Sequence, residues 1–69
     1  MPDYELIFYL TNGNKATIKL KNVNGTAQTI EANIQTQLKQ PDNDFHLANN
    51  TVVVRLKKNE ISGYSIDEL

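Results

Sequence analysis

Five of the seven basic residues of this 69-residue chain lie two or four positions apart along two segments. Lys15, Lys19 and Lys21 lie along one segment, and Arg55 and Lys57 lie along the other. In an extended strand, residues two positions apart point to the same face, so each group would present its cations on one side. Ammonium and guanidinium groups spaced in this way could neutralise the phosphates of a nucleic acid or bind another anionic partner.

Apolar side chains are expected on the same face as these cations. Tyr9 could stack on a base, but sheets that read RNA use several exposed aromatic residues. A protein surface or a second copy of the chain would also cover apolar groups there, and lysines alone can serve to keep a strand soluble. The candidate interaction face comprises Ile7, Tyr9, Lys15, Lys19, Lys21, Val53, Arg55 and Lys57.

Most acidic residues are predicted to lie away from this face. Glu5 would share it, and Glu31 falls in a predicted helix. The formal net charge is −1, which argues against strong non-specific binding to DNA or membranes by the molecule as a whole. The other acids fall in predicted turns and tails: Asp3, Asp42, Asp44, Glu60, Asp67 and Glu68.

Residue types that often catalyse reactions do not form a recognisable motif. His46 is the single histidine and lies on a predicted strand. Asp42 and Asp44 flank a predicted loop without a partner base, and Ser62 and Ser65 lie in a strand. The sequence has no nucleophile elbow, glycine-rich phosphate loop or zinc motif, and it has no cysteine. We therefore expect no catalytic activity, no metal and no cofactor.

The N-terminal part predicts a β-hairpin with strands at Tyr4–Leu10 and 15–21. A two-residue turn would place the apolar face of one strand beside the lysine face of the other. A three-residue loop that ends at Gly13 instead pairs Phe8 with Ala16. Because a one-residue slip moves every side chain to the opposite face, burial favours the three-residue loop.

One amphipathic helix is predicted from about residue 26 to residue 40. Apolar residues recur there every three or four positions, with Ile30 and Ile34 at the centre of the stripe. Thr26 can act as the N-cap by accepting an early backbone N–H. Pro41 restricts the residue before it and should end the helix.

The next two predicted strands cover residues 45–47 and 51–57. A two-residue turn at 49–50 would pair Leu47 with Val52. Phe45, Leu47, Val52 and Val54 would then share one face.

A last strand is predicted over residues 61–66, after a second tight turn at 58–59. Beyond this turn the apolar residues change from an odd position, Ile61, to even positions, Tyr64 and Ile66. A bulge at 62–63 would correct the parity and set Tyr64 beside Val54 in the neighbouring strand.

The elements predict a single α+β domain over residues 1–69, in the order β-β-α-β-β-β. One helix would cover one face of an antiparallel sheet with strand order 2-1-5-4-3. The first strand is central because both of its faces are mostly apolar. The predicted core is Tyr4, Leu6, Phe8, Leu10, Ala16, Ile18, Leu20, Ile30, Ile34, Leu38, Phe45, Leu47, Val52, Val54, Leu56, Ile61, Tyr64 and Ile66.

The C-terminal half carries a spaced pattern of apolar residues. The pattern is Phe45-x-Leu47, then Val52-Val53-Val54, then Asn59-x-Ile61-x-x-Tyr64-x-Ile66. It resembles the pattern in small uncharacterised α+β proteins of low-GC Gram-positive bacteria and their phages. The resemblance implies a cytosolic accessory or regulatory protein, and its motifs are structural, so it transfers no functional residue.

The sequence therefore predicts a small non-enzymatic binding module that acts through protein–protein contact or self-association on the open sheet face. A homodimer or another protein is the expected partner, and nucleic acid or another anionic ligand is the alternative. No apolar run approaches the roughly 20 residues of a membrane span. The N-terminus lacks the residue order of a signal peptide, so we expect a cytoplasmic protein without a membrane partner.

Overall fold

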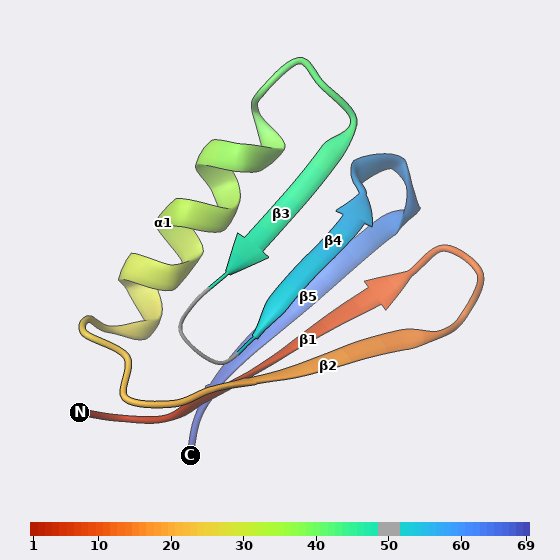
Figure 1. Cartoon of the computed structure of the whole chain (residues 1–69). Coiled ribbons are helices and arrows are strands. Elements are labelled where there is room, and N and C mark those ends of the chain that lie inside the picture. The colour runs from red at the N-terminus through yellow and green to blue at the C-terminus, as the bar shows by residue number, and fades with distance from the viewer. Residues whose placement is uncertain (49–51) are drawn as a thin grey trace.

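A computed structural model of the chain describes residues 1–48 and 52–69 (Figure 1). The predicted α+β class and element order are confirmed. The elements are β1 (Tyr4–Leu10), β2 (Lys15–Leu20), α1 (Ala27–Leu38), β3 (Asp44–Ala48), β4 (Val53–Lys57), the 3-10 turn η1 (Lys58–Glu60) and β5 (Ile61–Glu68).

A three-stranded antiparallel sheet has β1 at its centre, with β2 and β5 on either side. The predicted register of the first hairpin is confirmed, because Phe8 lies opposite Ala16. The Leu10 N–H donates to the Asn14 carbonyl at 2.9 Å and closes the loop. Gly13 has a φ of 89°, a left-handed conformation that glycine adopts without a clash from Cβ.

The predicted pairing of the last strand with the first is also confirmed. Tyr9 lies opposite Gly63 and Leu10 lies opposite Ile61, so Ser62 is the extra residue of a bulge. Its hydroxyl donates to the Tyr9 carbonyl at 3.0 Å. The extra residue keeps the apolar side chains before and after the bulge on the same face of the sheet.

The second hairpin, β3–β4, forms a separate two-stranded sheet. The predicted order 2-1-5-4-3 is therefore wrong where it joins β5 to β4. The predicted pairing within the hairpin is also wrong, because Leu47 lies opposite Val54 and not opposite Val52. This shift of two residues leaves every side chain on its predicted face. The predicted turn at 49–50 lies outside the described residues.

The connection from β4 to β5 is η1 and not the predicted two-residue turn. The Lys58 N–H donates to the Asn43 carbonyl at 2.7 Å, and the Asn59 N–H donates to the Asn43 side chain at 3.0 Å. The Thr11 N–H donates to the Glu60 carbonyl at 2.9 Å. These bonds lead the chain from the hairpin to the end of β1. Tyr64 is consequently opposite Phe8 on β1, and the predicted pairing of Tyr64 with Val54 is wrong.

The inner face of the three-stranded sheet is covered by α1 and by the β3–β4 hairpin, which run side by side (Figure 1). A helix is about 10 Å wide, whereas three strands span about 14 Å. The helix alone would leave part of the sheet uncovered, and the hairpin fills the remainder. The buried residues all belong to the predicted core: Tyr4, Leu6, Phe8, Ile18, Leu20, Ile30, Ile34 and Phe45.

The helix begins where the sequence predicts. The Thr26 hydroxyl accepts from the Thr29 N–H at 3.4 Å, and the Thr29 hydroxyl accepts from the Thr26 N–H at 3.5 Å, which is a capping box. Ile30 and Ile34 point into the core. Within the described ranges, no helix has the length and apolar character needed to cross a membrane.

Candidate functional site

The face of the three-stranded sheet that points away from the core is the best candidate for an interaction surface. On β1 it presents the side chains that alternate with buried Leu6 and Phe8. We call this surface the outer sheet face. Its nine residues are Glu5, Ile7, Tyr9, Lys15, Thr17, Lys19, Gly63, Ser65 and Asp67.

Tyr9 lies at one end of the outer sheet face, between Lys15 on β2 and Gly63 on β5. The tyrosine is 41% exposed. A Cβ placed on Gly63 would meet no atom within 4 Å, so no side chain covers this flank of the ring. The aromatic ring is therefore accessible both from above and from the side of β5.

Ile7 occupies the middle of the outer sheet face, between Thr17 and Ser65. Both neighbours have short side chains, so Ile7 is only partly buried. Together Ile7 and Tyr9 form an apolar strip along β1 that water contacts.

Charged residues occupy the opposite end of the outer sheet face. Glu5 lies between Lys19 on β2 and Asp67 on β5. The sequence placed Asp67 in a tail, but β5 continues to Glu68 and carries it onto the sheet. Two lysines, Lys15 and Lys19, and two carboxylates, Glu5 and Asp67, make the face neutral.

The prediction that the five alternating basic residues share one sheet face is wrong for the two on β4. Val53, Arg55 and Lys57 belong to the separate hairpin. Phe8 of the three-stranded sheet and Phe45 of the hairpin meet between the two sheets. On each sheet, the side chains that alternate with the buried ones therefore point away from the interior, and they form two different surfaces. The cations of β2 and β4 consequently do not form a continuous basic patch.

The outer side of the hairpin is partly neutralised. The Lys57 ammonium lies 2.8 Å from the Asp44 carboxylate. The hydrogen bond from Lys57 lowers the pKa of Asp44, and the same bond raises the pKa of Lys57. Arg55 lies opposite His46, and Val53 is 64% exposed. Lys57 is therefore already engaged by a carboxylate.

The other candidate residues lie apart from one another. Lys21 follows the last residue of β2. His46 is exposed, and its backbone N–H donates to the Gln37 side chain at 2.9 Å. The Asp42 carboxylate lies 3.3 Å from the Lys58 ammonium. In residues 1–48 and 52–69, no group of three or more histidine or acidic side chains could hold a metal ion.

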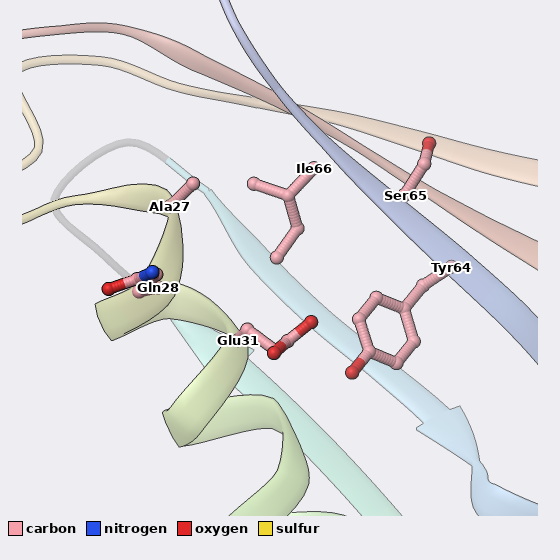
Figure 2. Close-up of a pocket in the computed structure, with 6 residues that line it drawn as sticks. All are labelled: Ala27, Gln28, Glu31, Tyr64, Ser65 and Ile66. Atoms are coloured by element: carbon pink, nitrogen blue, oxygen red, sulfur yellow. The ribbon is translucent and has the colours of Figure 1, made fainter.

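A groove that the sequence did not predict lies between α1 and β5 (Figure 2). Its volume is about 320 Å³. Ala27, Gln28 and Glu31 line it on the helix side, and Gln28 and Glu31 lie outside the apolar stripe, so the helical pattern alone does not indicate a groove. Only the position of β5 relative to the helix reveals the groove.

Near one end of this groove, the Tyr4 hydroxyl lies 3.4 Å from both the Gly25 carbonyl and the Glu68 carboxylate. Burial of the phenol raises the pKa of Tyr4, and the negative charge of Glu68 raises it further. The neutral phenol can donate its one hydrogen to either acceptor, so it helps to hold the end of β5 beside the loop that precedes α1.

The outer sheet face and the groove offer chemistry suited to contact with a partner: apolar side chains to bury, charges to pair, and a strand edge. Ser65 and His46, a hydroxyl and an imidazole, lie on different sheets. When the chain is compared with family models, with curated proteins and with solved structures, no match is found.

Proposed function

We propose that this protein is a small binding module without catalytic activity, and that it self-associates through the outer sheet face. One observation carries the proposal, which is that the charges of this face complement themselves in one orientation. Lys19 and Asp67 lie on the two edge strands at the same level, on either side of Glu5. A second copy that is turned over can therefore place its Asp67 opposite Lys19 and its Lys19 opposite Asp67.

The orientation follows from the positions of the edge strands. If two copies stack about a twofold axis parallel to β1, then β2 of one copy lies over β5 of the other, as in aligned packing of two sheets. Lys19 then faces Asp67 of the second copy, twice by symmetry, and Lys15 faces Gly63. An axis perpendicular to the strands would instead bring Lys15 against Lys19 of the second copy, which like charges disfavour.

Ile7 and Tyr9 would lie at the centre of this contact. Because the axis runs parallel to β1, each would meet its counterpart in the second copy and lose its exposure to water. The sheet face measures about 14 Å by 20 Å, which is smaller than a standard interface of about 800 Å² per partner. We therefore expect a weak dimer, with a Kd near 100 μM.

Sedimentation equilibrium from about 10 μM to 2 mM tests the proposal, since this range brackets the expected Kd. The average mass of the wild-type protein should rise towards that of a dimer. The double variant Ile7→Thr/Tyr9→Thr keeps β-branched residues on the strand but removes the apolar strip, and it should stay monomeric. Val53→Thr, on the other sheet, is the matched control and should dimerise normally. A wild-type protein that stays monomeric throughout would contradict the proposal.

Nucleic acid, the alternative partner, has less support because the outer sheet face is neutral and Lys57 already pairs with Asp44. Titration of labelled single-stranded DNA at low and high salt distinguishes it. Binding that weakens steeply with salt, and that is lost in Lys15→Gln/Lys19→Gln, would replace self-association with phosphate binding.

A further inference from the structure

We infer that the groove between β5 and α1 binds an extended peptide segment of a partner protein, which adds as a strand to the free edge of β5. This surface lies apart from the outer sheet face, so the inference does not depend on self-association. It rests on the direction of the backbone groups of β5, on the groove beside them and on the charges at its rim.

In residues 1–48 and 52–69, the hydrogen-bonding pattern shows which backbone groups of β5 have no strand partner. The Leu10 N–H donates to the loop that leads into β2. The backbone N–H and C=O groups of the even-numbered residues of β1 therefore point towards β2, and those of the odd-numbered residues point towards β5. The bond from the Leu69 N–H to the Asp3 carbonyl, at 2.9 Å, continues this pattern. The N–H and C=O groups of Tyr64 and Ile66 consequently point away from β1, to the open edge of the sheet.

The groove lies along this same edge. Ala27, Gln28 and Glu31 of α1 line one side, and residues 64–66 of β5 line the other. Figure 2 shows that Tyr64 and Ile66 point towards the helix, whereas Ser65 points away from it. An added strand would therefore bond to the free groups of β5 and place every second side chain in the groove.

The two edges of the sheet differ in their protection against added strands. The β2 edge carries Lys15 and Lys19, and charged lysines are a common device that prevents edge-to-edge pairing. From Ile61 to Ile66, β5 carries neither lysine nor proline. The β5 edge is thus the one suited to accept a strand.

The lining of the groove specifies the chemistry of the partner. Ala27 and Ile66 offer apolar surface for a short aliphatic side chain. Glu31 lies at the rim, and Glu68 lies on the same side of β5, so a lysine or arginine next to the aliphatic residue would be complementary. A second copy of this chain is a poor occupant, because its own β5 edge would bring another α1 and another Glu31 to the same place.

Amide hydrogen exchange with the peptide Ac-Lys-Thr-Val-Thr-Val-Thr-amide tests the inference, since its lysine and valines lie on one side of an extended chain. With a Kd near 1 mM, the peptide at about 5 mM should slow exchange at Tyr64 and Ile66 about sixfold. Ser65 already bonds to β1 and should change little. Binding without protection of these two amides, or no effect at all, would overturn the inference.

A charge exchange tests the role of Glu31, which is exposed, so its substitution should leave the fold intact. Glu31→Lys should weaken the lysine peptide about fivefold and strengthen the same peptide with glutamate in place of lysine. Glu60→Lys makes the same change of charge at η1 and is the control. Equal effects of the two variants would show that only the net charge matters and would overturn the assignment of the cation to the groove.

Discussion

Phe8 and Phe45 meet edge to face in the interior, with ring centroids 5.2 Å apart and ring planes at 63°. One residue belongs to the three-stranded sheet and the other to the hairpin, and both are almost fully buried. Since β4 forms no ladder with β5 in the part of the chain that the structure describes, packing of this kind attaches one sheet to the other.

This contact predicts how the hairpin is held. Phe45→Leu should lower the free energy of unfolding by about 1–2 kcal/mol, because it removes the aromatic contact and leaves a partial cavity. Phe8→Leu should have a similar effect, and the double variant should show a coupling of about 1 kcal/mol in urea unfolding. Val53→Ala, on the exposed side of the hairpin, is the control and should change stability by less than about 0.5 kcal/mol. Strictly additive effects would show that the rings do not act as a pair.

Substitution of two glycines, Gly13 in the loop between β1 and β2 and Gly63 in β5, should have different effects on stability. Gly13 has a positive φ, so Gly13→Ala should destabilise the protein by about 1 kcal/mol although a Cβ there meets nothing. At Gly63 a Cβ also meets nothing, and its φ lies outside the positive range, so Gly63→Ala should be neutral or slightly stabilising. Thermal unfolding of both variants measures the difference, and equal changes in Tm would refute the assignment of strain to Gly13.

Local pattern predicted much of this fold. The alternation of Ile18 and Leu20 with lysines, together with the glycine at position 13, was enough to predict the register of the first hairpin. The parity slip after Ile61 predicted a bulge at 62–63, and the structure has one at Ser62, although in the pairing with β1 and not in a pairing with β4. In each case the burial of one face rejects a slip of one residue, so the parity depends on neighbouring residues alone.

The attachment of the second hairpin could not be predicted in this way. The alternation of buried and exposed side chains in β4 is the same whether this strand pairs with β5 or packs, as part of a separate hairpin, on the inner face of the three-stranded sheet. The choice depends on how much of the sheet a single helix can cover and on the bonds of Asn43 to η1, which join distant parts of the chain. As a result the sequence pattern predicted that Arg55 and Lys19 share one sheet face, although they lie on separate sheets. It also placed Asp67 in a tail and not on the outer sheet face.

The pair between Asp44 and Lys57 predicts a dependence of stability on pH. The pKa of Asp44 is lowered from 3.8 by the hydrogen bond from Lys57, so the folded state binds this proton less tightly than the unfolded state. The stabilisation is present above the unfolded pKa and is lost as the pH falls through the folded pKa. Urea midpoints of wild type and Asp44→Asn should therefore differ at neutral pH and converge below about pH 4.

Salt provides the control for this pair. Both side chains are largely exposed, with 59% of Lys57 and 72% of Asp44 accessible, so the effect should be small and should shrink at high ionic strength. A difference between wild type and Asp44→Asn that is independent of both pH and salt would show that the carboxylate acts through packing.

Glu5 opposes the proposed dimer. In the orientation that pairs Lys19 with Asp67 of the second copy, Glu5 faces Glu5 close to the axis, and like charges there are unfavourable. Glu5→Gln should therefore strengthen self-association about threefold, measured as a lower Kd in sedimentation. A weaker dimer in this variant would indicate that the two faces meet in a different orientation.

The strongest test of the orientation exchanges the charges of Lys19 and Asp67. Lys19→Asp and Asp67→Lys should each weaken the homodimer about tenfold, because each places like charges in both symmetry-related pairs. An equal mixture of the two variants should form a heterodimer, since both pairs between positions 19 and 67 are then complementary, and isotope-filtered NMR would detect it. Lys15→Asp makes the same change on the same strand, but it faces Gly63 in the second copy and should have the smaller effect. If Lys15→Asp weakens the dimer as much as Lys19→Asp and the mixture forms no heterodimer, then the charges act through the net potential of the face and not through the pairing of Lys19 with Asp67.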